Sequence, residues 1–421
     1  METNSLKKQV KANKTLLSNF SYMSLLQVFT LLTPLMTYPY LTRVLGKELY
    51  GLVITAQILA SYAMIVVRFG FDSVSARHVS IWREDKRKIS EILSSILTIR
   101  VALFVVSLIV YGIIVIAVPE YRDHFWLFIF SYGITLNVLL FPQFFFQGIE
   151  RMKFITYINV IIQMIFVLLI FCIIKAPSDY LWVPILHAIG YSMGGGLSLL
   201  IIFRKYNILY TIPSLKQISY YFKDALPLFA TDAVCTIKDK LNYLILGITV
   251  GMSDVVIYDV GSKLTYIAIQ PLTIINTVVF PRMAKSKNNK MVLKFGGIIL
   301  MTVLILVILI NLFLGYIVRF LIGEDINLFP IRLFLLSPIF LCLGSYIGSS
   351  LIVARGYNKY MFYSILITTS AYLLLLFLMM LSGKLNTVIS FIYLTVISYL
   401  VEMIYRIYIG FTIMNKRMVN N

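Results

Sequence analysis

Residues 101–118 read VALFVVSLIVYGIIVIAV and contain no charged side chain. An α-helix needs about 20 mostly apolar residues to cross the hydrocarbon core of a bilayer. With its flanks, this run therefore predicts a membrane-spanning helix over residues 90–118. The whole chain has the same character: its 421 residues are 60% hydrophobic and its mean hydropathy is +0.89, which excludes an ordinary soluble globular protein.

Similar apolar runs recur along the chain and predict about twelve membrane helices in an all-α integral membrane protein. The predicted spans are residues 16–41, 50–72, 90–118, 124–148, 154–174, 181–203, 225–250, 254–281, 292–318, 328–354, 360–382 and 386–410. The connections between them are too short for a catalytic or receptor domain. The sequence also lacks the G-x-x-x-x-G-K-[ST] loop of ATP-hydrolysing proteins. We therefore expect a protein that is not an enzyme.

Basic residues are distributed unevenly among the connections. Most of the 37 Lys and Arg residues lie in alternate connections, such as residues 83–88 and 204–223, whereas residues 119–123 and their counterparts are nearly neutral. Basic loops stay in the cytoplasm, so both termini are expected there. The net charge of +19 is then explained by loops that face the anionic head groups of membrane lipids, and no nucleic acid is expected as a partner.

The connection at residues 204–224 is a linker that divides the chain into an N-terminal lobe, residues 1–203, and a C-terminal lobe, residues 225–421. Each lobe has about six predicted spans. The exits of the fourth and tenth spans are similar, because Gly148 and Gly356 both lie among basic residues just before an aromatic entry to the next span. This pattern suggests two parallel repeats related by an axis along the membrane normal.

Cysteine and histidine have no spacing that indicates a disulfide framework, a metal site or a cofactor. The cysteines are far apart in apolar runs, and the histidines are expected to pack or to lie at the membrane interface. These residues are Cys172, Cys235, Cys342, His78, His124 and His187.

Five basic residues lie inside predicted spans, where charge is costly and is usually turned towards a cavity or a partner. They are Arg68, Arg100, Lys238, Lys240 and Lys263. One interpretation is a water-filled cavity between the two halves that binds a phosphate or pyrophosphate, because both Arg and Lys bind phosphate oxygens. The alternative is that these cations pair with nearby acids and hold helices together. Asp72 and Asp259 lie four residues from Arg68 and Lys263 and favour that alternative for those two cations.

The acidic residues of the seventh and eighth spans could have a separate role. Asp232, Thr236, Asp239 and Tyr243 follow helical spacing and form one polar stripe. Asp232, Asp239 and Asp259 are therefore candidates for binding a coupling proton or sodium ion.

Several motifs resemble a known family. YLTRVLGKELYG at residues 40–51 is similar to the first external loop of Wzx-type polysaccharide repeat-unit flippases, and PQFFFQGIERMK at residues 142–153 is similar to their fourth-span motif. FGFD at residues 69–72 and FPR at residues 280–282 resemble the exits of the second and eighth spans. The chain departs from the family at residues 256–259, where many members have Gly-Tyr-Tyr.

The resemblance implies membership of the multidrug, oligosaccharidyl-lipid and polysaccharide exporter superfamily, with two six-helix lobes and alternating access. It also implies a substrate, an undecaprenyl-pyrophosphate-linked oligosaccharide of O-antigen or capsule. The substrate would cross the bacterial inner membrane from the cytoplasmic to the periplasmic leaflet, coupled to an ion gradient. The polymerase and the chain-length regulator of the same pathway would be further partners.

Three other functions stay open. A membrane polymerase or ligase that joins repeat units would need a large external loop with catalytic Arg or His. A drug/cation antiporter of the same superfamily would need an acidic cavity. A flippase for the peptidoglycan precursor is excluded less firmly, because its substrate also carries a pyrophosphate.

Overall fold

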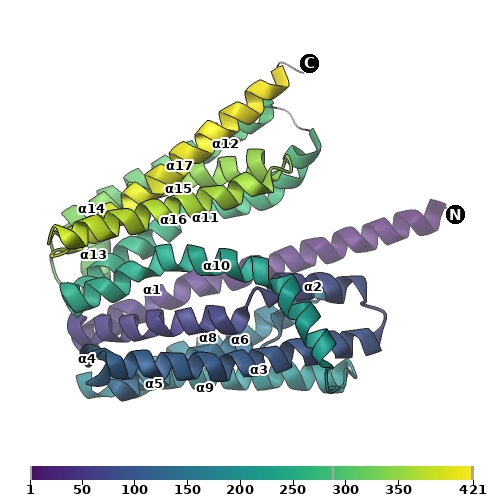
Figure 1. Cartoon of the computed structure of the whole chain (residues 1–421), viewed down its shortest axis with the longest axis horizontal. Helices are drawn as coiled ribbons and strands as arrows, with labels where there is room; N and C mark the ends of the chain where they lie inside the picture. The colour runs from purple at the N-terminus through teal and green to yellow at the C-terminus, as the bar shows by residue number, and fades with distance from the viewer. Residues whose placement is uncertain (1, 287–288, 419–421) are drawn as a thin grey trace. The chain divides into compact units, whose positions relative to one another are not determined.

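The computed structural model describes residues 2–286 and 289–418, and every regular element within them is a helix (Figure 1). The elements of the first half are α1 (Glu2–Arg68), α2 (Phe71–Ile81), α3 (Lys86–Ala117), α4 (Pro119–Arg122), α5 (Phe125–Tyr132), η1 (Gly133–Thr135), α6 (Leu136–Leu140), α7 (Gln143–Gly148), α8 (Met152–Ile173), η2 (Pro177–Leu181), α9 (Trp182–Leu200) and η3 (Ile201–Lys205). Those of the second half are α10 (Leu215–Thr249), α11 (Met252–Ser286), α12 (Asn289–Leu312), α13 (Leu314–Ile322), α14 (Phe329–Phe334), α15 (Ser337–Ile347), η4 (Gly348–Val353), α16 (Asn358–Leu381) and α17 (Val388–Met418). The all-α membrane class is confirmed.

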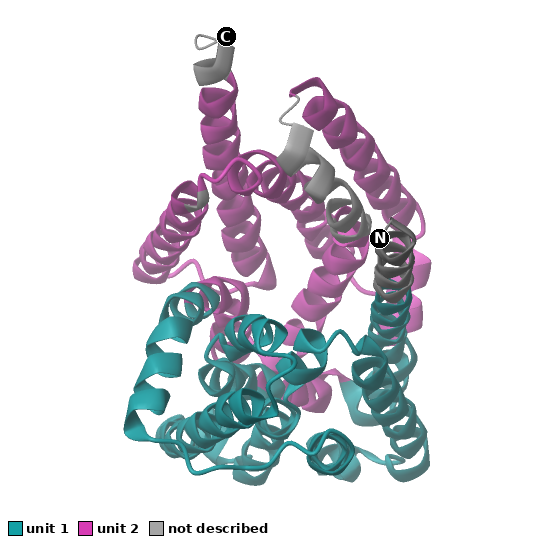
Figure 2. Cartoon of the chain, turned by 90° about the vertical axis from the view of Figure 1, so that its right-hand side faces the viewer, with its two compact units in different colours: residues 1–46, 56–233 teal, residues 47–55, 234–421 magenta. Residues whose placement is uncertain are grey.

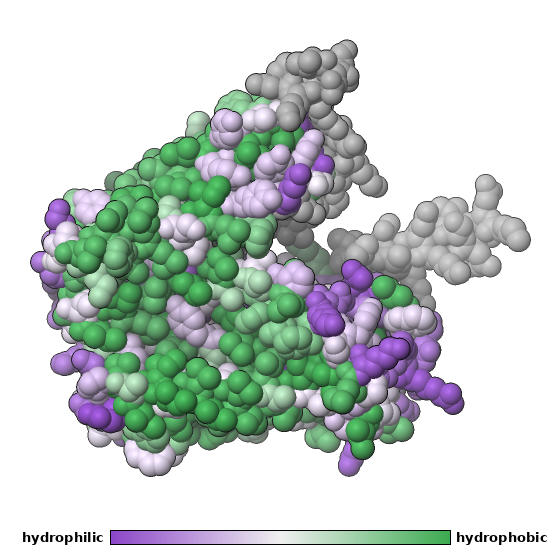
Figure 3. Space-filling model, in the orientation of Figure 1, coloured by the Kyte–Doolittle hydropathy of each residue, from purple (hydrophilic) through white to green (hydrophobic). Residues whose placement is uncertain are grey.

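Nine stretches of the described chain are long and apolar enough to cross a membrane. Eight of the predicted spans each match one of them, and the ninth, Ser18–Ile81, contains the first two predicted spans. The seventh and eighth predicted spans correspond to α10 and α11, which are not among the nine. The count of twelve and the cytoplasmic termini therefore remain predictions. Figure 3 shows the apolar colour spread along the flanks of the helices, as expected for surfaces in contact with lipid.

The predicted connection between the first two spans falls at a kink in α1 that joins two helices. α1 continues through residues 42–49 and departs from helical geometry at Gly46, where φ is 77° and ψ is 163°. Glycine adopts this positive φ without the steric cost that a side chain would incur. One residue is thus enough to redirect the helix, and no open loop is needed.

Two compact units make up the chain (Figure 2). Unit 1 comprises residues 1–46 and 56–233, and unit 2 comprises residues 47–55 and 234–421. The predicted linker, residues 204–224, belongs to unit 1, and α10 runs from one unit into the other.

Unit 1 is built on close approaches between helices at small residues. α2 packs on α7 because Gly148 leaves room for Val79, and a Cβ at Gly148 would lie 2.6 Å from the Val79 side chain. α8 packs on α9 because Gly194 leaves room for Ile162. Buried aromatic and aliphatic side chains of α2, α3 and α7 fill the core beside these contacts. Helices that share lipid as their solvent associate through such close packing.

Unit 2 is held together around α17, which packs against α15 and α16. Gly344 of α15 lies against the backbone of Met403, where a Cβ would be 3.4 Å from its Cα. The Tyr346 hydroxyl donates to the Val292 carbonyl at 2.7 Å and ties α15 to α12. This packing brings the polar residues of α10, α11, α16 and α17 into the interior of the unit.

Candidate functional site

Arg100 is the buried cation of unit 1. Its side chain is fully buried in α3, and it donates to Asp72 Oδ1 at 2.6 Å and to the Val138 carbonyl at 2.8 Å. The guanidinium carbon also lies 5.4 Å from the centroid of the Phe144 ring. The charge is therefore balanced by one carboxylate, and its planar fork contacts two different parts of the unit.

A proline explains why the Val138 carbonyl is available. In a regular helix this carbonyl would accept from the amide four residues later, but that residue is Pro142, which has no N–H. The helical path ends at Phe141, whose φ of −106° and ψ of 91° are extended, and α7 begins after Pro142. Arg100 thus satisfies a carbonyl that the break between α6 and α7 leaves without a backbone donor.

Arg68 and Asp232 extend this cluster. Arg68 Nε lies 3.6 Å from Asp72 Oδ2, so the predicted i,i+4 pair is confirmed. Asp72 therefore faces two cations, Arg68 and Arg100. Asp232, in the unit 1 part of α10, interacts electrostatically with Arg68. Arg68 keeps 39% of its side chain exposed, which makes it the accessible cation of the group.

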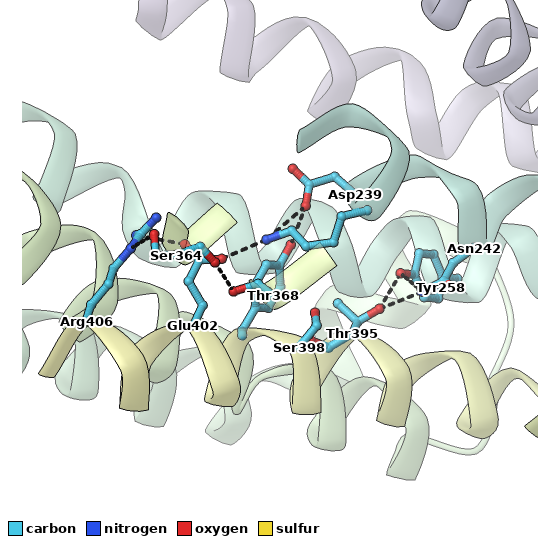
Figure 4. Close-up of polar contacts among 11 residues, drawn as sticks. Asp239, Asn242, Tyr258, Ser364, Thr368, Thr395, Ser398, Glu402 and Arg406 are labelled. Carbon is cyan, nitrogen blue, oxygen red and sulfur yellow. Dashed lines mark hydrogen bonds and ion pairs between the residues drawn. The ribbon is translucent and has the colours of Figure 1, made fainter. Parts of the chain in front are cut away.

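Unit 2 contains a chain of four charged side chains (Figure 4). Lys238 of α10 donates to Glu402 Oε2 at 2.8 Å, and Arg406 NH1 lies 2.7 Å from Glu402 Oε1. Arg406 Nε also donates to the Ser364 hydroxyl of α16 at 3.1 Å. Lys238 Nζ lies 3.7 Å from Asp239 Oδ1 on its own helix. Two cations and two carboxylates thus form one network, in which Lys238, Glu402 and Arg406 are largely buried and Asp239 keeps 36% of its side chain exposed.

Tyr399 closes this network on the α17 side. Its hydroxyl donates to Asp239 Oδ1 at 3.5 Å, and the Lys238 ammonium lies 4.8 Å from the centroid of its ring. Lys240, which lies on α10 with Lys238, is half-buried. The structure therefore surrounds Lys238 with protein partners. This geometry matches the helix-pairing alternative for Lys238 and Arg100, and a substrate-binding role for either cation is still a prediction.

Asp259 and Lys263 form the ion pair that their spacing predicts in α11. Asp259 is buried and also accepts from the Tyr243 hydroxyl at 3.2 Å, whereas 37% of the Lys263 side chain is exposed. Lys263 is thus the accessible cation of this pair, as Arg68 is in unit 1.

A neutral network lies beside the charges. Asn242 is fully buried, and its amide nitrogen donates to the Tyr258 hydroxyl at 3.0 Å and to Thr395 Oγ1 at 2.8 Å. The Tyr372 hydroxyl donates to Asn242 Oδ1 at 2.6 Å. One side chain of α10 is therefore bonded to α11, α16 and α17. A saturated buried network of this kind fixes how helices pack.

The predicted stripe on α10 does not act as one surface. Asp232 interacts with Arg68 of unit 1, whereas Asp239 and Tyr243 bond to residues of unit 2. Sequence reasoning also missed Glu402 and Arg406, which complete the charge network. Their four-residue spacing is the same signal that identified Asp259 and Lys263, and it could have found them.

The histidines contact protein groups. His78 Nε2 lies 2.8 Å from Asp224 Oδ2, and His187 stacks on the Phe166 ring at 3.8 Å between centroids. His124 lies edge-on to Tyr180. None of these contacts joins two histidines.

Comparison with known proteins gives a family and a fold. The family model described as "Polysaccharide biosynthesis protein" matches residues 16–287. A relative from Escherichia coli strain K12 is 23% identical over 355 residues, which is 81% of this chain and 84% of the relative. A second, from Shigella dysenteriae, is 26% identical over 60% of this chain and 64% of its own length. Both are named "Putative O-antigen transporter".

Solved transporters share the fold at low identity. An inward-facing multidrug resistance MATE family transporter of the MOP superfamily aligns with a TM-score of 0.68 at 12% identity, over 94% of this chain and 99% of its own. The lipid II flippase MurJ in an inward closed conformation aligns with a TM-score of 0.69 at 16% identity, over 91% and 86% of the two chains. At this identity the likeness describes the fold alone.

Proposed function

We propose a function from one premise: this chain belongs to the polysaccharide biosynthesis protein family. In our proposal it is a flippase for a lipid-linked oligosaccharide. The finer form of the proposal is an undecaprenyl-pyrophosphate-linked repeat unit of O-antigen or capsule, moved across the bacterial inner membrane by alternating access. The names of the two relatives and the multi-pass helical fold support it.

The observation that carries the proposal is ionisable side chains buried inside a helical membrane protein. Buried ion pairs add little stability, because desolvation offsets their attraction. Charges retained at membrane depth are therefore expected to have a functional role. Glu402 pairs with both Lys238 and Arg406. In our proposal an anionic oxygen of a pyrophosphate would take the place of its carboxylate.

Exchange of partners is the mechanism we propose. The accessible cations, Arg68 and Lys263, would contact the pyrophosphate first, and Lys240 would assist them. Pyrophosphate oxygens would then compete with Glu402 for Lys238, and Arg100 would hold the helix break of unit 1 in place. No covalent bond of the substrate changes in this cycle.

Coupling to an ion gradient would use the carboxylates. Protonation of Asp239 would remove one of the two negative charges beside Lys238 and weaken its hold on the ammonium. Asp232 and Asp259 are the other candidates, because each interacts with one of the accessible cations. A sodium ion bound at the same carboxylates would have the same electrostatic effect.

The direct test is transport in proteoliposomes that contain only this protein. A polyprenyl-pyrophosphate oligosaccharide with a fluorescent sugar is placed in both leaflets, and a membrane-impermeant quencher reports how much becomes accessible with time. We expect movement with the wild-type protein and at least a tenfold loss with Lys238→Ala plus Lys240→Ala. The matched control is Lys384→Ala plus Arg122→Ala, which removes two exposed cations.

Each rival function predicts a different outcome of this experiment. Growth of the oligosaccharide would indicate a polymerase, and uptake of an organic cation without movement of the lipid would indicate a drug antiporter. Equal movement of lipid II would change the proposed substrate to the peptidoglycan precursor. Normal movement with the Lys238 and Lys240 variant would overturn the cationic site while leaving the flippase function intact.

A further inference from the structure

Four basic residues lie at two helix ends, at the start of α8 and at the end of η3. We call them the basic surface: Arg151, Lys153, Arg204 and Lys205. The ammonium groups of Lys153 and Lys205 lie 5.4 Å and 5.0 Å from the centroid of one ring, that of Phe154. Two like charges thus lie at one aromatic ring. A nearby anion would lower the electrostatic energy of this arrangement.

No protein carboxylate within the described residues forms an ion pair with the basic surface. Glu150, the adjacent acid, is bonded to Arg83 at 2.8 Å, and the first turn of α8 contains no acidic residue. The ring of Phe154 is fixed in turn by Phe146 at 5.4 Å and by Tyr206 at 6.3 Å between centroids. Among the described residues the basic surface is therefore a group of cations without a carboxylate partner.

Exposed apolar side chains lie on α9, which η3 continues, and in the chain beyond η3. Met193, Leu197 and Leu200 follow an i, i+4, i+7 spacing along α9, are all exposed, and lead towards Arg204 in η3. Beyond η3, Ile212 and Leu215 are 92% and 83% exposed. Such exposure is unfavourable in water, whereas side chains of this kind partition into the interface of a bilayer. Figure 3 shows hydrophilic colour gathered at the end of unit 1 where α2 ends and α3 begins, with apolar colour along its flank.

We propose that the basic surface binds the phosphate of an anionic phospholipid in the cytoplasmic leaflet. The lipid chains would run along the apolar stripe of α9, and the side chains of Ile212 and Leu215 would insert among neighbouring head groups. A phosphate with attached chains matches both observations, since the cations need an anion and the adjoining side chains need an apolar environment. Basic pockets between membrane helices on the cytoplasmic side bind anionic lipids through the same chemistry.

This site does not depend on the identity of the transported substrate. The basic surface lies at the start of α8 and the end of η3. The charge networks proposed for transport involve other helices, namely α3, α10, α11 and α17. Anionic lipid bound there would hold the start of the chain segment that leads into α10 against the membrane. Loss of lipid binding would thus leave substrate recognition unchanged.

The test measures lipid binding to the full-length protein in detergent by native mass spectrometry. Phosphatidylglycerol and phosphatidylcholine with identical acyl chains are compared at equal concentration. Each basic residue near a membrane surface contributes about 1 kcal/mol, so Arg204→Gln plus Lys205→Gln should weaken phosphatidylglycerol binding about 30-fold at low ionic strength. Phosphatidylcholine binding should be unchanged. The matched control, Arg122→Gln plus Lys384→Gln, removes the same charge elsewhere and should have no effect.

Two further arms distinguish a lipid from a free anion and from other partners. Ile212→Asn plus Leu215→Asn should lower the binding of both lipids without changing their ratio. Inorganic pyrophosphate should not displace phosphatidylglycerol; displacement at equal concentration would show a soluble-anion site and overturn the proposal. Equal binding of the two lipids by the wild-type protein, or unaltered phosphatidylglycerol binding by the Arg204 and Lys205 variant, would overturn it as well.

Discussion

Replacing Lys238 by methionine should destabilise unit 2 by about 3 kcal/mol. The change removes the 2.8 Å bond to Glu402 and a cation 3.7 Å from Asp239. Removing one partner of a buried pair costs roughly 3–5 kcal/mol. We expect the lower end of this range, because Arg406 still holds the other oxygen of Glu402 at 2.7 Å. The measurement is the free energy of SDS-induced unfolding in mixed micelles, followed by circular dichroism.

A second substitution, made together with Lys238→Met, tests the physical cause of this loss of stability. Asp239→Asn in the Lys238→Met background removes the carboxylate that is left without a cation, because Glu402 keeps Arg406, so at least half of the lost stability should return. The control is Lys384→Met, whose exposed site predicts a change within about 0.5 kcal/mol. If Lys238→Met costs less than 1 kcal/mol by this measurement, or if the two substitutions are additive, the network is not electrostatically coupled and the reasoning is refuted.

Three other substitutions test separate features. Arg100→Lys keeps the charge but offers one nitrogen in place of the two that bond Asp72 and the Val138 carbonyl. A buried carbonyl left without a donor should lower the unfolding free energy by about 1–3 kcal/mol. An unchanged unfolding free energy would contradict the contact between Arg100 and this carbonyl. Gly70→Ala forces a side chain onto a φ of 71° and places its Cβ 2.8 Å from Leu228 Cβ. The yield of folded protein should fall, and the free energy of unfolding should drop by about 1–3 kcal/mol. Wild-type stability would show that the helix end adjusts. Asp239→Asn should weaken the dependence of transport on the ion gradient, and unchanged sensitivity to an uncoupler would remove this residue as a coupling candidate.

The sequence was sufficient to predict features that form between residues close together in the chain. Apolar runs and alternating basic connections identified a helical membrane protein, and the four-residue spacing identified the pairs of Arg68 with Asp72 and of Lys263 with Asp259. Such pairs need only the geometry of one short stretch of chain. The connection at residues 42–49 is shorter than predicted, because one glycine is enough to change the direction of the helix.

Contacts between helices could not be predicted in the same way. Lys238 and Glu402 are 164 positions apart, and Arg100 and Asp72 are 28 apart. Depth in the membrane shows that a charge needs a partner, but it does not show whether that partner is water, a ligand or a carboxylate. Only the packing of the helix faces decides this, and one sequence does not contain the register of those faces.

The break at Pro142 has a consequence for how this protein can tolerate change. Alanine at that position would supply an amide that competes with the Arg100 guanidinium for the Val138 carbonyl, in a site where Arg100 is sealed from water. Swapping a residue disfavoured in helices for a good helix former would then be harmful here. Arg100 and Pro142 therefore depend on each other, and restoring a regular helix at this position would require replacing both.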